Sequence, residues 1–125
     1  MRITCRLALA ALPFLAAVTA HTGEKTPVQQ APARAVLAVN PLANQEGASR
    51  AGAKLYAREC AACHGPTGEG MGKALPLTAS EVHDAAPGAL FWVLTNGSLR
   101  RGMPSFAHLP EAQRWQIVGY LKNQL

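Results

Sequence analysis

Two cysteines and a histidine within five residues limit what this 125-residue chain can fold around. In Cys60-Ala61-Ala62-Cys63-His64 the two thiols lie one helical turn apart, and the imidazole follows the second thiol directly. The chain has room for one domain with a modest core, because many of its apolar residues are alanines and aromatic residues make up only 6%. Domains of this size often need stabilisation beyond side-chain packing, such as a disulfide or a bound metal.

Three interpretations of this motif leave part of it unexplained or incomplete. A zinc site needs four ligands, and the remaining candidates, His83 and His108, do not form a familiar second pair. A thiol oxidoreductase places its cysteine pair at the start of a helix beside a parallel sheet, whereas this pair follows a predicted helix in a chain without a convincing strand. A plain disulfide would use both cysteines but gives the adjacent His64 no role.

A fourth interpretation explains all three residues, because Cys-x-x-Cys-His is the attachment pattern of c-type haem. Thioether bonds from Cys60 and Cys63 would fix the edge of the porphyrin, and His64 would then lie under the iron as its proximal ligand. We therefore expect one covalently attached haem c per chain, with iron as the metal.

The iron has a sixth position, for which the sequence offers four candidates: Met71, Met103, His83 and His108. Met71 follows His64 by only seven residues, which makes the opposite side of the ring hard to reach. Met103 lies 39 residues after His64, where Gly102 lets the backbone come close and Pro104 fixes the chain after the ligand. We expect His64 and Met103 to be the iron ligands. The alternatives are a histidine ligand or a Met103 that only fills the core.

The chain divides into an export signal, a linker and one domain. Residues 1–20 carry two arginines, an apolar run over 7–18 and small residues up to Ala20, which is the layout of a signal peptide cleaved after Ala20. The apolar run is shorter than the about 20 residues that span a bilayer. Residues 21–47 mix Pro, Gln, Ala and Gly and predict a flexible linker, and residues 48–125 form the domain. We expect a periplasmic protein.

Three helices are predicted within the domain. Ser49 is a candidate cap for a helix over residues 50–60, and a glycine-rich loop follows it. Pro87 opens a second helix that Asn96 and Gly97 end, and a last helix covers residues 111–124. Apolar residues repeat at helical spacing in the last helix, which predicts one buried stripe.

The stretches "GAKLYARECAACHGPTGEGMG", "PGALFWVLTNG", "RGMPSF" and "WQIVGYLK" resemble the class I cytochromes c, in the broad bacterial group of single-haem domains. The resemblance implies a small all-α fold with three to five helices around a covalently bound haem. It also implies that the first and last helices cross, with Gly52 and Tyr56 meeting Ile117 and Tyr120. In this family the proximal histidine donates its other N–H to a proline carbonyl, for which Pro76, or else Pro66, is the candidate.

A histidine and methionine pair fills both axial positions of the iron, so we expect an electron-transfer protein without catalytic residues rather than an enzyme. The partners would be redox proteins, such as a periplasmic dehydrogenase or terminal oxidase, and no nucleic acid. Two alternatives stay open: a haem subunit of such a complex, and a gas-binding or catalytic haem protein with an open sixth site. The expected pocket walls are Leu55, Leu75, Leu77, Phe91, Trp92, Leu94 and Phe106.

The charge of the chain is mildly basic. The formal net charge is +5, and +3 remains once Arg2 and Arg6 leave with residues 1–20. Arg100 and Arg101 precede the expected methionine ligand, where they would either steer an acidic partner, meet a haem propionate or stay solvated. Steering would make association weaker with added salt.

Overall fold

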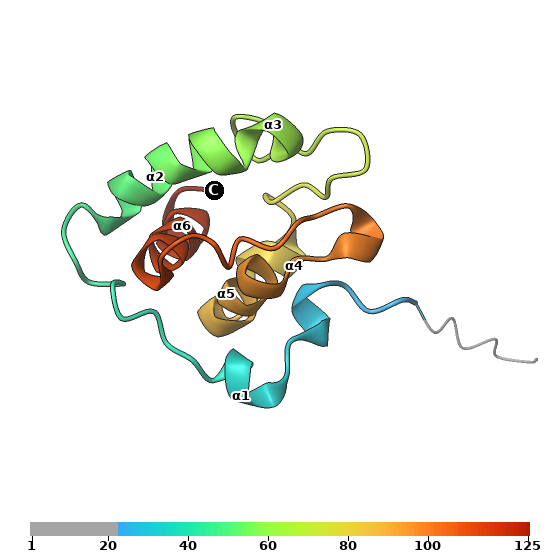
Figure 1. Ribbon diagram of the computed structural model, residues 1–125, viewed down its shortest axis with the longest axis horizontal. Coiled ribbons are helices and arrows are strands. Elements are labelled where there is room, and N and C mark those ends of the chain that lie inside the picture. The colour runs from blue at the N-terminus through green and yellow to red at the C-terminus, as the bar shows by residue number, and fades with distance from the viewer. Residues whose placement is uncertain (1–22) are drawn as a thin grey trace, which may run out of the picture.

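Helices account for the regular structure of this chain. The computed structural model describes residues 23–125, so the expected signal peptide over 1–20 lies outside the described residues. The helices are η1 (Val28–Gln30), α1 (Ala33–Val36), α2 (Ala48–Glu59), α3 (Ala61–His64), α4 (Ser80–His83), α5 (Pro87–Asn96), η2 (Leu99–Arg101) and α6 (Glu111–Gln124) (Figure 1). Over residues 23–125 the only extended pairing is a single antiparallel bridge between Ser98 and Met103. The all-α prediction is confirmed.

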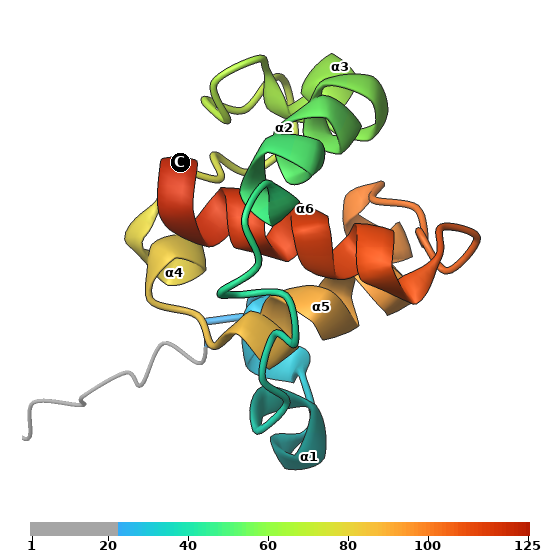
Figure 2. The ribbon, with the colours of Figure 1, turned by 90° about the vertical axis from the view of Figure 1, so that its left-hand side faces the viewer.

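Helices α2 and α6 cross at a glycine and make the most extensive contact between helices in the described part of the chain (Figure 2). A Cβ atom at Gly52 would lie only 2.0 Å from the carbonyl oxygen of Gln116, so the two backbones touch there. Next to this point the rings of Tyr56 and Tyr120 lie 5.2 Å apart, and Ile117 is fully buried. The crossing therefore has the composition that the resemblance implies.

Helix α5 packs against α6 and forms the other side of the core. It begins at Pro87 and ends at Asn96, as predicted, and the Gly97 amide closes its last turn on the Val93 carbonyl at 2.7 Å. Phe91 stacks on Trp115 with 4.0 Å between the ring centroids. These contacts fix α5 relative to α6, and so relative to α2.

The expected Ser49 cap is not what begins α2. The helix starts at Ala48, and its N-cap is Gly47, whose φ of 81° is the left-handed conformation that glycine adopts without strain. The Gly47 carbonyl already accepts the amide of Ala51 at 2.9 Å, so Ser49 lies inside the first turn. There its hydroxyl is buried among the described residues without a hydrogen-bond partner. The helix begins about two residues earlier than the sequence predicted.

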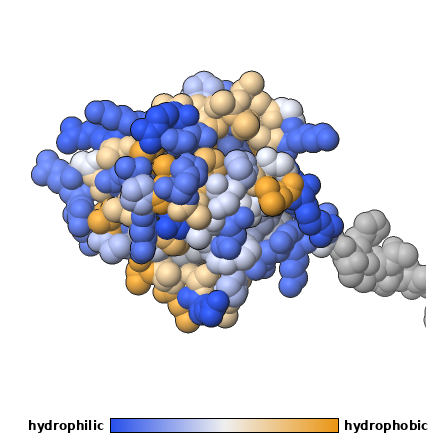
Figure 3. Space-filling view, viewed as in Figure 1, coloured by the Kyte–Doolittle hydropathy of each residue, from blue (hydrophilic) through white to orange (hydrophobic). Residues whose placement is uncertain are grey.

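Much of the expected flexible linker packs on the domain. We call residues 24–42 the N-terminal segment; it contains η1 and α1, and both contact α5. The side-chain amide of Asn40 donates to the Trp115 carbonyl at 3.0 Å. At the lower end of the molecule, where α1 lies, apolar side chains reach the surface (Figure 3), and Leu37 and Val39 are each 81% exposed. The segment thus has a packed side and an exposed end.

Candidate functional site

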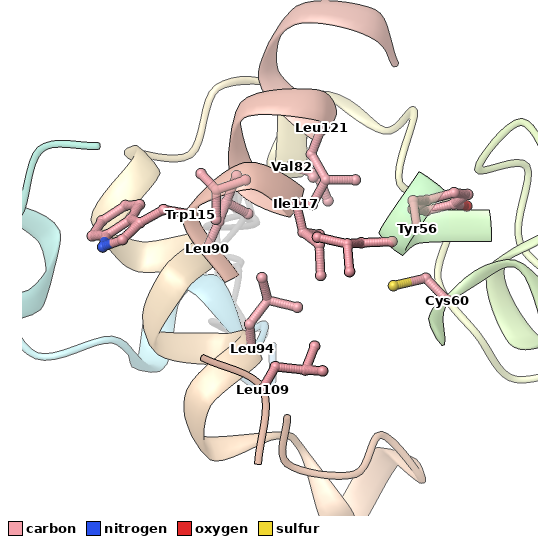
Figure 4. Close-up of a cluster of buried hydrophobic side chains, with 11 residues drawn as sticks. Tyr56, Cys60, Val82, Leu90, Leu94, Leu109, Trp115, Ile117 and Leu121 are labelled. Carbon is pink, nitrogen blue, oxygen red and sulfur yellow. The ribbon is translucent and has the colours of Figure 1, made fainter. Parts of the chain in front are cut away.

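A sharp helical turn after α2 brings the motif together. The Cys60 carbonyl accepts the amides of both Cys63 and His64, at 3.1 and 2.9 Å, and so starts the short helix α3. Cys60 is buried and Cys63 is exposed, and no disulfide joins them. In the close-up the Cys60 side chain points into the buried apolar cluster, towards Ile117 (Figure 4). The two sulfurs therefore occupy different environments on one turn of helix.

The environment of Cys60 argues against the thiolate chemistries. Burial is the largest cause that raises the pKa of its thiol to about 12, and the neighbouring Glu59 and Cys63 act in the same direction. A thiol with a raised pKa is not the reactive thiolate that redox cysteines use. Within residues 23–125 no group of three or more His, Cys, Asp or Glu is placed to hold a metal ion.

His64 is oriented by a carbonyl in the loop that follows it. Its Nδ1 atom lies 3.0 Å from the Leu75 carbonyl oxygen, and because a carbonyl only accepts hydrogen bonds, Nδ1 is the atom that carries the proton. Nε2 therefore has its lone pair available for a metal. The expected acceptors, the carbonyls of Pro76 and Pro66, were wrong. The acceptor is the carbonyl of the Leu75–Pro76 peptide bond, and a following proline favours an extended conformation of the residue before it.

The loop between His64 and Leu77 is closed by its own backbone and by Tyr56. The Gly70 amide donates to the His64 carbonyl at 2.8 Å, and a Cβ atom at Gly70 would lie 2.8 Å from the Ala74 carbonyl oxygen. The buried hydroxyl of Tyr56 donates to the Gly65 carbonyl at 2.7 Å. Burial raises the pKa of Tyr56 to about 12. These bonds attach the loop that orients His64 to the α2–α6 crossing.

An apolar cavity of about 570 Å³ lies between α2, α5 and α6. Cys60, Cys63 and His64 line one part of it. Leu90, Leu94 and Ile117 are buried side chains that contribute to its apolar lining (Figure 4). The volume falls in the range of small-molecule and cofactor sites. A large, mostly apolar macrocycle fits such a lining, to which both cysteines belong.

Met103 lines the same cavity and is held there by the chain on both sides. Its amide and carbonyl pair with the carbonyl and amide of Ser98, at 3.1 and 2.8 Å, which closes the η2 turn. Gly102 has a φ of 82°, and a Cβ atom at Gly97 would lie 2.6 Å from the Pro104 carbonyl carbon. The methionine thus belongs to a tight loop rather than to a helix face.

Of the other three candidates for the sixth position of the iron, one lines the cavity and two do not. Met71 also lines the cavity but is 55% exposed. His83 and His108 are exposed and lie outside its lining. His83 instead lies 3.2 Å from the Asp84 carboxylate, and His108 lies beside Phe106 with 5.9 Å between the ring centroids. Among residues 23–125, therefore, Met71 and Met103 line the cavity, and His64 is the only histidine that does.

Some of the predicted pocket walls are correct and some are not. Four of the seven line the cavity: Leu75, Leu77, Leu94 and Phe106. Leu55 instead faces the core, Phe91 stacks on Trp115, and Trp92 lines a separate, smaller cavity. The sequence missed the contribution of Thr26, Pro27 and Val28, which also line the cavity. No periodicity or motif marks them, because they lie in a segment of mixed composition.

A small helical domain that gathers a Cys-x-x-Cys-His motif on the wall of one apolar cavity defines the class of c-type cytochrome domains. Residues 47–121, more than half of the chain, match the family described as cytochrome c oxidase, cbb3-type, subunit III, and the chain belongs to that family. The domain accordingly carries a covalently bound haem c, with Cys60 and Cys63 positioned for its attachment.

A solved structure shows the same fold. It is cytochrome cL from the marine methylotrophic bacterium Methylophaga aminisulfidivorans, with a TM-score of 0.52 and 21% identity. The match covers 65% of this chain, and this chain spans 57% of the length of that protein. A comparison with curated proteins gave no match.

Proposed function

We propose that this protein is a periplasmic carrier of single electrons whose haem iron is bound by His64 on one side and Met103 on the other. The observation that carries the proposal is one cavity lined by Cys60, Cys63, His64 and Met103 together. Membership in a cytochrome c family fits an electron-transfer role.

The hydrogen bonding of His64 supports its role as the proximal ligand. Because Nδ1 donates to the Leu75 carbonyl at 3.0 Å, the ring is fixed in the tautomer that offers Nε2 to the iron. A hydrogen-bonded imidazole is also a more basic ligand.

Met103 is the stronger candidate for the opposite position. It is partly buried, it packs against the core cluster, and its backbone is paired on both sides with Ser98. Met71 lies on an exposed loop close to His64 in sequence. A ligand needs a fixed backbone, and the loop of Met103 provides one.

The haem supplies the one-electron change when bound. The chain's own residues keep the site dry and fixed: Leu90, Leu94 and Ile117 exclude water, while the Leu75 carbonyl orients His64. A thioether ligand and an apolar pocket both favour the reduced state, so we expect a comparatively high reduction potential.

Features of the sequence and of the surface support the proposed export and the proposed partners. Residues 1–20 have the layout of a signal peptide. Among the described residues, no helix is long and apolar enough to cross a membrane. Met71 and Leu75 line the cavity and are 55% and 39% exposed, beside Lys73. This rim would meet a redox protein that donates or accepts the electron.

A second candidate function is a haem subunit of an oxidase or dehydrogenase complex. The name of the matching family, which describes an oxidase subunit, favours it. Size-exclusion chromatography of a native extract, followed by the haem absorbance, separates the two. A carrier elutes as a small free protein, whereas a subunit elutes with a complex many times larger.

Carbon monoxide binding to the reduced protein tests the axial ligands. We expect slow and weak binding to the wild type and to Met71→Ala, and ready binding to Met103→Ala, because only Met103 closes the sixth position. The absorption band of an iron–thioether bond in the oxidised protein should disappear in Met103→Ala alone. Ready binding to the wild type would instead support an open-site, gas-binding haem protein.

A further inference from the structure

The N-terminal segment, residues 24–42, forms part of the wall of the haem cavity. Thr26, Pro27 and Val28 line it, although the match to the cytochrome family begins only at residue 47. In Figure 1 the blue start of this segment lies near the orange loop that contains η2. The cavity wall at this place is therefore built by a part of the chain that precedes the family domain.

The N-terminal segment is attached to the loop that holds Met103. The Arg101 guanidinium donates to the Lys25 carbonyl at 3.4 Å. The Arg100 and Glu24 side chains lie 3.9 Å apart, but both are exposed, so their attraction contributes little. The hydrogen bond from the Arg101 side chain to the Lys25 backbone therefore joins the N-terminal segment to the Met103 loop next to the cavity.

The N-terminal segment is also attached to the helical core at two points where a close fit is needed. A Cβ atom at Gly88 of α5 would lie 2.0 Å from the Ala35 carbonyl oxygen, so only glycine admits α1 there. Asn40 donates to the Trp115 carbonyl of α6 at 3.0 Å and accepts the Leu42 amide at 2.9 Å. A loosely attached tether would not require either contact.

Two buried polar atoms without a hydrogen-bond partner belong to residues of the same cavity wall. They are Thr26 Oγ1 and Arg101 Nε, half of the four such side-chain atoms in the described part of the chain. Buried polar groups that lack a partner are rare and call for one. A guanidinium N–H only donates and a hydroxyl can also donate, so one group that satisfies both atoms is an acceptor, and the positive charge of Arg101 favours an anion.

A haem carries such groups, since its two propionates are carboxylates that extend from an otherwise apolar ring. We propose that the N-terminal segment is a strap that completes the haem site, in which Thr26 and Arg101 together hold a haem propionate. The strap then closes the cavity beside the Met103 loop and keeps water from it. This inference rests on the bound haem of the proposed function, but not on which residue is the sixth ligand.

Nuclear Overhauser contacts in the reduced, haem-loaded protein test the assignment directly. We expect contacts between the Thr26 side-chain protons and the methylene protons of one propionate. Their absence, in a spectrum that shows other contacts between the haem and the protein, overturns the role of Thr26.

Hydrogen exchange of the same protein measures what the contact contributes. Thr26→Val keeps the shape of the side chain and removes the hydroxyl. A hydrogen bond to a charged group is strong enough that its loss should speed amide exchange over residues 24–42 by at least about tenfold. Thr78→Val, at an exposed threonine outside the cavity lining, should leave exchange unchanged. Equal rates in wild type and Thr26→Val would contradict the proposal.

Gly88→Ala tests the strap as a whole, because the added methyl group clashes with the Ala35 carbonyl. We expect residues 24–42 to lose their protection from exchange and the reduction potential to fall as water reaches the haem. Gly119→Ala is the matched control, since its methyl group would meet only Asn40 Nδ2 at an ordinary 3.5 Å. If residues 24–42 exchange freely in the wild type, there is no strap.

The outcomes for the strap and for the proposed axial ligand are independent. Carbon monoxide binding to the wild type would refute Met103 as the ligand while leaving the contacts of Thr26 intact. Conversely, an iron–thioether band in the wild type without any contact of Thr26 to a propionate would refute the strap alone.

Discussion

Replacing Gly52 by alanine tests the helix crossing on which the haem site is built. An alanine Cβ there would lie 2.0 Å from the Gln116 carbonyl oxygen, 2.6 Å from its carbonyl carbon and 3.0 Å from Tyr120 Cβ. Nonbonded carbon atoms are comfortable at about 3.5 Å or more, so α2 and α6 would have to separate by about 1 Å or more. The two nearest of these atoms belong to the α6 backbone and cannot rotate away.

The expected cost follows from two opposing contributions. Overpacking a well-packed contact costs about 1–3 kcal/mol, and a backbone clash belongs at the upper end of that range. Alanine has a higher helix propensity than glycine, which stabilises the folded protein by about 1 kcal/mol. The free energy of unfolding of Gly52→Ala should therefore fall by about 2 kcal/mol. Since α2 ends at Glu59, directly before Cys60, the carbon monoxide affinity of the reduced protein should also rise.

Guanidinium unfolding of the haem-loaded protein, followed by far-ultraviolet circular dichroism, measures this change. Gly119→Ala in the same helix pair is the control, because its methyl group meets no atom closer than 3.5 Å, and it should be neutral or more stable by up to about 1 kcal/mol. A Gly52→Ala protein as stable as the wild type would show that the two backbones do not touch at this point.

Two further variants report on the core around the site. Above pH 10 the free energy of unfolding should fall by up to about 1.4 kcal/mol per pH unit, because burial raises the pKa of Tyr56 from 10.0 to about 12, so the unfolded chain releases this proton first. Tyr56→Phe should lose that part of the slope in urea titrations at each pH, and an unchanged slope would contradict the assignment. Ile117→Val, at a fully buried position, should cost about 0.5–1.5 kcal/mol in the same assay. Val39→Ala, at a position 81% exposed, should cost under about 0.5 kcal/mol, and equal costs would mean that Ile117 is not in the core.

The helical fold and the attachment motif could be predicted from the sequence because each rests on local chemistry. Pro87 begins α5 and Gly97 follows its last residue. The spacing from Cys60 to His64 depends on one turn of helix. The same is true of Met103 as an axial candidate, since glycine and proline beside it indicate a fixed turn. These features need only neighbouring residues, which a sequence shows directly.

The start of α2 shows what neighbouring residues alone cannot predict. Ser49 has a good capping side chain, yet the left-handed Gly47 begins the helix and leaves the Ser49 hydroxyl without a partner. Likewise the carbonyl of Pro76 was expected to accept from His64, but the carbonyl in contact belongs to Leu75, one residue earlier. A sequence can place the start of a helix or a hydrogen-bond acceptor to within one or two residues. Which residue and which atom make the contact depends on the backbone conformation of the folded chain.

By itself, therefore, the sequence determined a helical domain with a Cys60, Cys63 and His64 attachment site and the candidates for its sixth ligand. Only the tertiary structure decided which candidates reach the cavity, and that Thr26 from the N-terminal segment and Arg101 both line it. The physical reason is distance along the chain. Contacts between segments 75 residues apart, such as that of Asn40 with Trp115, depend on how whole helices pack, and no local pattern encodes them.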